Sequence, residues 1–237
     1  MQEPVSPIQI TLPVRQLVEF LRRVGSIDNR FTGFDRANEG ARIHRKLQRA
    51  AVKEHADYAA EVFLRGIFAY EEIEFTLEGR ADGIFTAADG VTVVDEIKTT
   101  VCPAADITPD FAPEHWAQAI VYAAIYAAQH ELEEMRVQLT YFQVDEELIL
   151  RFERHYTAQQ LQEEVEALLA EYAPWARRAV EWKKARNSDL QAMHFPFPAY
   201  RPGQRAMAGE VYKVCRDGGQ LLCQAPTGIG KSMSVLF

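Results

Sequence analysis

Three charged residues near the middle of the chain have the types and the spacing for metal-dependent phosphodiester chemistry: Asp82, Glu96 and Lys98. Side chains alternate faces along a strand, so Glu96 and Lys98 should point the same way. Two carboxylates that face each other repel unless a cation lies between them, and oxygen ligands suit Mg²⁺ or Mn²⁺. Lys98 could orient a water or stabilise charge developing on a phosphate. The alternative is an exposed hairpin with solvated charges, in which Glu96 simply pairs with Lys98.

A β-hairpin must bring the two carboxylates together, and its turn is visible in the sequence. The segments GRADGIF and VTVVDEIKTT flank Ala88-Asp89-Gly90, and three-residue loops favour Gly in the left-handed position at their end. Such a loop pairs residue 87 with residue 91 and therefore Asp82 with Glu96, about 5 Å apart at Cβ. The neighbouring Asp95 should face the other way, and we interpret it as a structural residue or a support behind the site.

The rest of residues 1–195 has the pattern of an α/β domain. Residues 61–100 alternate with the period of strands, and MRVQLTYFQV and LILRFERH follow as two more. A Pro- and Asp-rich loop is predicted over 101–112. A domain boundary is predicted at MHFPFPAYRPG, residues 193–203, because Pro and Gly cluster there. Helical periodicity predicts helices over 12–24, 36–57, 113–131 and 157–187, the last with Pro174 as a potential break.

The motif order within residues 10–190 resembles the PD-(D/E)XK nucleases, in their RecB-like branch. GRADGIF followed by VVDEIKTT is similar to the core of that family. Gly40-Ala-Arg-Ile-His44 resembles the upstream GxxxH of the branch, whose His is a metal ligand. Gln118-Ala-Ile-Val-Tyr122 resembles the QxxxY of the helix after the ExK strand, with both side chains on one helix face.

This resemblance implies a restriction-endonuclease-like core, in which helices flank a central mixed sheet, and metal-dependent cleavage of DNA, preferentially single-stranded. It implies that one or two Mg²⁺ or Mn²⁺ ions are held by His44, Asp82, Glu96 and the Ile97 carbonyl. Lys98 would position the attacking water. Gln118 and Tyr122 would orient the strand, and Arg42 and Lys46, which share a helix face with Arg49 and Lys53 beside His44, would line the DNA path. A solvated basic face is the alternative for that stripe.

Two departures from the family pattern are visible. Ala81 stands where relatives often have Pro, which leaves the chemistry intact because the carboxylate carries it. Cys102 is the only Cys of residues 1–195, so the iron–sulfur cluster that many relatives hold with four Cys is not expected.

A non-catalytic DNA-binding module that feeds a helicase motor is the rival interpretation, with ATP-driven unwinding as the main function of the full-length protein. The intact charged motif argues against it.

A second set of motifs lies in residues 196–237. APTGIGKS, residues 225–232, resembles a P-loop with Ala225 at the first Gly position, and Gln220–Gln224 is predicted as its feeding strand. Tyr200-Arg-Pro-Gly-Gln204 resembles the adenine-sensing Q motif of superfamily 2 helicases. Together they are similar to the start of an XPD- or DinG-like DNA helicase. The predicted nucleotide-binding residues are Gln204, Thr227, Gly228, Ile229, Gly230, Lys231 and Ser232.

Residues 196–237 are therefore predicted to be the truncated start of a RecA-like P-loop domain. Forty-two residues are too few for an independent ATPase core. We expect an N-terminal fragment of a longer nuclease–helicase, which by itself neither hydrolyses ATP nor unwinds DNA. ATP would be a cofactor and partner of the full-length protein only.

Composition sets the remaining expectations. The chain has 237 residues, of which 48% are hydrophobic and 25% charged, as in ordinary globular proteins. No apolar run approaches the roughly 18 residues of a membrane span, and no secretory signal is apparent, so a cytoplasmic location is expected. A net charge of −8 argues against nonspecific coating of nucleic acid. The charge is uneven, with a net of −11 over residues 1–195 and +3 over 196–237. The oligomeric state stays open.

Overall fold

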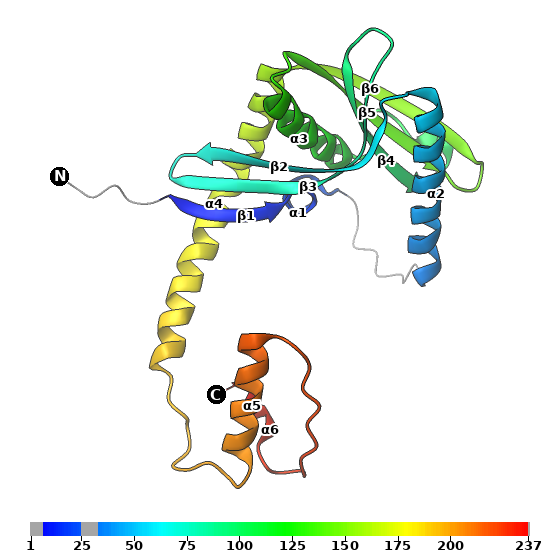
Figure 1. Cartoon of the computed structure of the whole chain (residues 1–237). Coiled ribbons are helices and arrows are strands. Elements are labelled where there is room, and N and C mark those ends of the chain that lie inside the picture. Colours follow the sequence, from blue (N-terminus) through cyan, green and yellow to red (C-terminus); the bar gives the residue numbers. More distant parts are fainter. Residues whose placement is uncertain (1–6, 25–32, 237) are drawn as a thin grey trace, which may run out of the picture. The chain divides into compact units, whose positions relative to one another are not determined.

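The computed structural model describes residues 7–24 and 33–236, which divide into two compact units, residues 1–178 and 179–237. The first unit is an α/β domain, and α4 runs from it into the second (Figure 1). The elements in chain order are β1 (Ile8–Pro13), α1 (Val14–Arg22), α2 (Gly33–Glu54), β2 (Ala59–Tyr70), β3 (Ile73–Thr86), β4 (Thr92–Thr100), a 3₁₀ turn (Ala104–Asp106), α3 (Pro113–His130), β5 (Glu134–Gln143), β6 (Leu148–Thr157), α4 (Ala158–Ala192), α5 (Gln204–Asp217) and α6 (Lys231–Leu236).

One mixed sheet holds the first unit together. Its order is β1-β3-β4-β5-β6, with β2 along the other side of β3. The β1–β3 and β4–β5 pairs are parallel, whereas β2–β3, β3–β4 and β5–β6 are antiparallel. The long strand β3 connects the two parts of the sheet, since its first half pairs with β1 and its last four residues pair with β4. The expectation of a central mixed sheet flanked by helices is confirmed.

Helices cover both faces of this sheet. Apolar residues of α1, α3 and the first half of α4 form the main core with β3, β4 and β5 on one face, where Leu77, Val121 and Leu161 are fully buried. The helix α2 packs on the opposite face, through Ile43 and Leu47 against Ile97. Burying a side chain of this size contributes about 1.5–3 kcal/mol, so the two cores fix the sheet between α2 and α3.

The hairpin of β3 and β4 has the predicted register. Gly83 pairs with Asp95 and Thr86 with Thr92, and the loop between them closes through a hydrogen bond from the Ala87 N–H to the Val91 carbonyl at 2.9 Å. Gly90 has φ +87°, the left-handed conformation that favours Gly there. The ladder nevertheless ends at Gly83–Asp95, so it stops one pair short of the two carboxylates.

One helix prediction needs correction, and the potential break in another is not present. The predicted helix over 12–24 begins later, because residues 8–13 form β1, a strand that pairs with β3 in parallel. Parallel pairing joins residues far apart in sequence, which a local periodicity does not report. The helix α4 also continues through Pro174 without a break. Buried Leu169, Ala173 and Ala176 on either side of Pro174 pack into the core, which offsets the lost hydrogen bond.

The second unit corrects a further prediction. Residues 220–224 form no strand, and Leu222 is 99% exposed. A strand needs a partner for its backbone groups, and the described part of residues 179–236 contains none. Residues 101–112 are a loop as predicted, apart from the 3₁₀ turn. No helix among the described residues is long and apolar enough to cross a membrane.

Candidate active site

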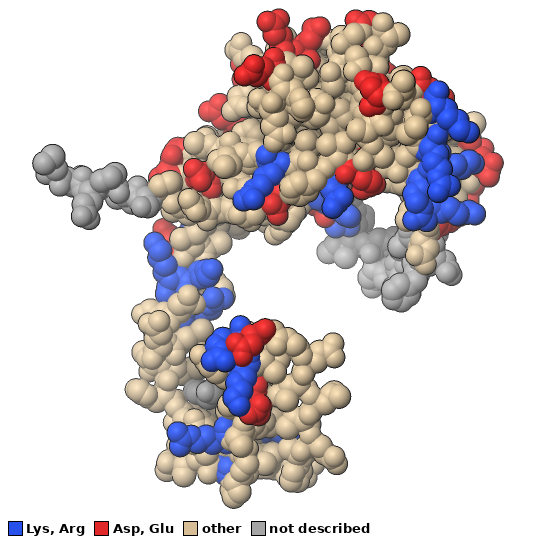
Figure 2. All heavy atoms as spheres, viewed as in Figure 1, with Lys and Arg blue, Asp and Glu red and all other residues tan. Residues whose placement is uncertain are grey.

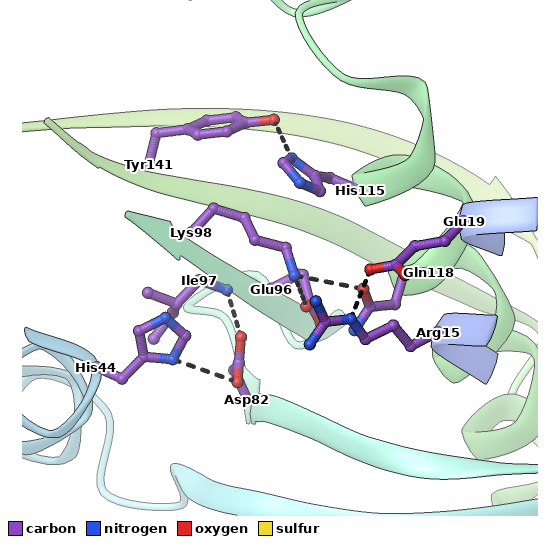
Figure 3. A network of polar contacts seen from close by, with 10 residues as sticks. All are labelled: Arg15, Glu19, His44, Asp82, Glu96, Ile97, Lys98, His115, Gln118 and Tyr141. Carbon is purple, nitrogen blue, oxygen red and sulfur yellow. Dashed lines mark hydrogen bonds and ion pairs between the residues drawn. The ribbon is translucent and has the colours of Figure 1, made fainter. Parts of the chain in front are cut away.

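A cleft with a volume of about 410 Å³ lies between α1, α2, β4 and α3, and Lys98 and His44 line it. Asp82 and Glu96 are not part of its lining but contact residues that are. Figure 3 shows the polar network of this cleft, in which Lys98 and Glu96 come from β4 and His44 from α2. The residues that line the cleft are Arg15, Val18, Glu19, Arg23, His44, Ile97, Lys98, Thr99, Glu114, His115 and Gln118.

Asp82 is held at its side chain by two neighbours. Its Oδ2 accepts the backbone N–H of Ile97 at 2.7 Å, and its Oδ1 lies 3.5 Å from Nδ1 of His44 (Figure 3). The Asp82 side chain is 15% exposed, so these contacts are shielded from water on most sides. One carboxylate oxygen therefore bridges to β4, while the other faces α2.

The backbone at Asp82 leaves the regular sheet. The β2–β3 ladder pairs residue 60 with 83 and residue 62 with 81, but Glu61 and Asp82 do not pair, and Glu61 has φ +54°. The side-chain amide of Gln48, on α2, instead donates to the Asp82 carbonyl at 3.0 Å and to Oε1 of Glu61 at 3.1 Å. Buried Gln48 thus satisfies backbone and side-chain acceptors that the broken ladder exposes. Sequence reasoning missed Gln48, although it lies one helical turn after His44.

Glu96 lies beside Lys98 on the α3 side of β4. Lys98 Nζ donates to Glu96 Oε1 at 2.7 Å and to the Gln118 side-chain carbonyl at 3.3 Å (Figure 3). The Lys98 side chain is 24% exposed and borders the cleft, while Gln118 is buried on α3. The amine is therefore held at a fixed point between a carboxylate and an amide.

The carboxylate of Glu96 is nearly inaccessible, and one of its oxygens is free. Its residue is 1% exposed, and Oε2 is buried without a hydrogen-bond partner. Burial raises the pKa of Glu96 to about 7, against the opposing effect of Lys98 and with a smaller contribution from Asp82. A buried, unpaired carboxylate oxygen is costly unless something binds it.

These residues supply donors of the kind that a hard divalent cation takes. His44 offers an imidazole nitrogen, and Asp82 and Glu96 offer carboxylate oxygens, of which Glu96 Oε2 has no partner. The pKa of His44 is raised, chiefly by its hydrogen bond to Asp82, so a cation would compete with its proton. Among residues 7–24 and 33–236, no three His, Cys, Asp or Glu side chains are gathered closely enough to form a ready ligand set. The donor chemistry fits, and binding would require the side chains to converge.

Asp95 faces away from this cleft, as predicted. Its Oδ1 accepts from Gln138 at 2.9 Å and from the Thr140 hydroxyl at 2.6 Å, both on β5. Burial raises the pKa of Asp95, and the two hydrogen bonds oppose that shift. Asp95 therefore ties β4 to β5 directly behind the site.

The two residues of the QxxxY motif differ in their access to the cleft. Gln118 lines the cleft and accepts a hydrogen bond from Lys98, whereas Tyr122 is 3% exposed and packs against the sheet. A Cβ on Gly79 would overlap the Tyr122 hydroxyl, so a glycine at this point of β3 makes room for the ring. Burial raises the pKa of Tyr122. A DNA contact by Tyr122 stays a prediction, and its packing role was not anticipated.

The cleft contains further residues that the sequence motifs did not indicate. Arg15 of α1 donates to Glu19 at 2.6 Å, one turn along the same helix, and both line the wall opposite His44. His115 of α3 lies 2.9 Å from the Tyr141 hydroxyl through Nδ1. Burial, with Lys98 and Arg15 nearby, lowers the pKa of His115 to about 3, so this ring is neutral at physiological pH. The i, i+3 spacing of His115 and Gln118 on a helix was the available signal.

The predicted DNA-path residues lie on the outer face of α2. Arg42 and Lys46 are exposed, and Lys46 Nζ lies 5.8 Å from the centre of the Phe142 ring. They border a different hollow from the cleft that Lys98 lines. His44 is on the same helix but faces Asp82.

The predicted nucleotide-binding residues lie in the second unit. A loop ending at Gly230 leads into α6, and Gly228 and Gly230 have φ +80° and +87°. Lys231 Nζ donates to the carbonyls of Ala225 and Pro226 at 3.1 and 3.0 Å. Gln204 is buried and donates to the Gly230 carbonyl at 3.2 Å, so the two motif segments touch. The backbone of Thr227, Ile229 and Ser232 belongs to the same loop and helix start.

Comparison with known proteins gives a family for this arrangement. Residues 14–202 match the family model of the PD-(D/E)XK nuclease superfamily, a span that includes Asp82, Glu96 and Lys98. The chain is similar to the crystal structure of SSO0001, with 17% identity over 72% of this chain and 78% of that chain and a TM-score of 0.42. It is similar to LHK-Exo in complex with dAMP, with 14% identity over 78% and 95% of the two chains and a TM-score of 0.38. No curated protein matches the chain significantly.

Proposed function

Because the chain belongs to the PD-(D/E)XK nuclease superfamily, we propose that it hydrolyses phosphodiester bonds of DNA at the cleft beside Lys98, with single strands preferred. Members of the superfamily are nucleases that generally use divalent metal ions. The observation that carries the proposal is the contact of Lys98 with Glu96, next to the Asp82 carboxylate that Ile97 and His44 hold. The preference for single strands rests on the RecB-like order of the motifs.

We assign the metal-binding role to Asp82, Glu96, His44 and the Ile97 carbonyl, with Mg²⁺ or Mn²⁺ as the ion. Such an ion would supply Lewis acidity and a more acidic water. Glu96 Oε2 supports the assignment because it is buried and unpartnered. Binding at that oxygen would relieve the desolvation of the carboxylate.

Lys98 is proposed as the residue that acts on the reacting groups. Its ammonium, held by Glu96 and Gln118, can orient a water and offset charge on the phosphate as the bond breaks. Gln118 fixes where that ammonium lies. Gln118 and Tyr122 are proposed to orient the DNA strand. Because Tyr122 is buried, its effect on the DNA would be indirect, through its packing against neighbouring residues.

The second unit carries a further proposal, nucleotide binding as part of a longer helicase. The contact between Gln204 and the Gly230 carbonyl favours this proposal, since it joins the segment that resembles the Q motif to the segment that resembles the P-loop. Binding of ATP and unwinding of DNA by the full-length protein are part of that proposal. A non-catalytic module that delivers DNA to a motor is the competing function of the first unit.

A cleavage assay tests the nuclease proposal. Single-stranded DNA labelled separately at each end is incubated with the chain and Mg²⁺ or Mn²⁺, without ATP. We expect metal-dependent cleavage that falls about 100-fold or more in Lys98→Ala. Lys213→Ala, which removes an exposed lysine of α5, is the matched control and should cleave normally. Cleavage that survives in Lys98→Ala would reject the role of Lys98. No cleavage of single- or double-stranded DNA with either metal would favour the binding module.

A further inference from the structure

A second hollow runs along the outer face of α2, with a volume of about 940 Å³. Phe142 and Val144, at and just after the end of β5, form part of its other wall. Lys and Arg side chains gather over α2 in Figure 2. The cations that line this hollow, all exposed, are Arg42, Arg45, Lys46, Arg49 and Lys53, which we call the α2 basic groove.

The charge of the α2 basic groove is largely unneutralised. Among ion pairs between described residues, only Arg42 of these five cations has a partner, Glu39 at 4.0 Å. Glu39, Glu54 and Glu147 also border the hollow, which leaves an excess of positive charge. Residues 1–195 carry a net charge of −11, so a cationic face on this unit is a local exception. Such a face attracts a polyanion and releases its counterions.

A smaller hollow of about 310 Å³ joins the α2 basic groove to the catalytic cleft. It shares Glu39, Ile43 and Val144 with the groove and Thr99 with the cleft. Gly40 lies at this passage, and a Cβ there would be 3.4 Å from the Thr99 hydroxyl oxygen. The smaller hollow therefore adjoins both the groove and the cleft, and the absence of a side chain at Gly40 leaves space there.

We propose that one polynucleotide strand extends from the catalytic cleft past Gly40 and Thr99 into the α2 basic groove, where its phosphates contact the five cations. This inference rests on the proposed nuclease function and adds the path of the uncleaved part of the substrate. Residues 42–53 span about 16 Å along the helix axis at 1.5 Å per residue. A substrate must extend beyond the cleaved bond to reach them, so cleavage efficiency should rise with strand length.

Binding without cleavage tests the groove independently of catalysis. The affinity for a labelled single strand is measured against salt in the Lys98→Ala background with EDTA. Adding Arg45→Ala and Arg49→Ala should reduce the slope of log affinity against log salt by about 1.4, at about 0.7 per lost phosphate contact. Arg65→Ala, an exposed arginine of β2, is the control and should leave the slope unchanged. An unchanged slope in the groove variant would overturn the proposal, even if the wild-type chain is an active nuclease.

Cleavage of strands of increasing length tests the path. Wild-type chain should cleave long strands more efficiently than the shortest, and Arg45→Ala/Arg49→Ala should lose that gain while it cleaves the shortest strand normally. Gly40→Leu should have the same effect by filling the passage. The single-strand path would be overturned if these variants lost the same fraction of cleavage at every strand length. It would also be overturned if duplex DNA bound as strongly as single-stranded DNA, with the same dependence on salt. A wild-type chain that cleaves nothing would reject the proposed function, while the binding experiment would still decide whether the groove holds DNA.

Discussion

The Asp82 carboxylate accepts the backbone N–H of Ile97 at 2.7 Å, at the point where the β3–β4 ladder has already ended. A side chain thus replaces the backbone acceptor that a continued ladder would have supplied. The bond holds β3 to β4 while it keeps the second Asp82 oxygen directed toward His44. The proposed metal ligand is therefore also a structural link, and substitutions at this position must separate the two roles.

Two substitutions of Asp82 separate them. Asp82→Asn keeps an oxygen that can accept from Ile97, so stability should change little while cleavage falls about 100-fold. Asp82→Ala leaves the buried Ile97 N–H unsatisfied and should cost about 1–3 kcal/mol in the free energy of unfolding as well. Urea unfolding and the cleavage assay, run on both variants, check this. Full activity in a stable Asp82→Asn protein would contradict the proposed role.

Gln48 is predicted to position Asp82. Gln48→Met keeps the size of the side chain but removes the amide that binds the Asp82 carbonyl and Glu61. We expect a loss of about 1–3 kcal/mol in unfolding free energy and a higher metal concentration for half-maximal cleavage. Gln129→Met, which removes an exposed amide bound to the Arg65 carbonyl, is the control. If Gln48→Met alters stability but leaves the metal dependence unchanged, Gln48 has only a structural role.

The buried Glu96 makes stability depend on pH. Its folded pKa of about 7 exceeds the ordinary value of 4.5, so the folded chain binds this proton more tightly than the unfolded chain. The metal-free protein should therefore lose stability as pH rises from about 4.5 to 7 and change no further above that. Glu96→Gln should melt about 5 °C higher than wild type at pH 8 and show little difference at pH 4.5. Parallel melting curves across this range would show that Glu96 ionises normally.

Gly79 and Tyr122 should behave as a packed pair. Gly79→Ala would place a Cβ against the Tyr122 hydroxyl and 2.9 Å from its Cε1, which should cost about 1–3 kcal/mol. Tyr122→Phe removes the nearest atom, so the double variant should be more stable than Gly79→Ala alone. A double-mutant cycle by urea unfolding measures this coupling. Purely additive losses would mean that the ring and the glycine do not constrain each other.

Local patterns in the sequence predict most of the first unit. The three-residue turn ending at Gly90 sets the register of β3 and β4, because turn length fixes which residues pair. The periodicity predicts α3 to within a residue, over 113–130 against a predicted 113–131. Periodicity fails for residues 8–13, whose strand exists only through pairing with β3. The strand expected over residues 220–224 from the P-loop resemblance is absent, and no partner strand for it is present among the described residues.

The sequence by itself determined which residues are the candidates for the proposed chemistry, since Asp82, Glu96 and Lys98 have suitable types at a spacing that one hairpin brings together. Only the tertiary structure decided how they are held. Gln48 contacts the Asp82 carbonyl across 34 residues, and Lys98 contacts Gln118 across 20. Turn and strand rules describe neighbours along the chain or across one ladder, whereas burial of α2 and α3 against opposite faces of the sheet brings these distant partners together. That packing also leaves Glu96 desolvated, buries Tyr122 and exposes the cations of the α2 basic groove.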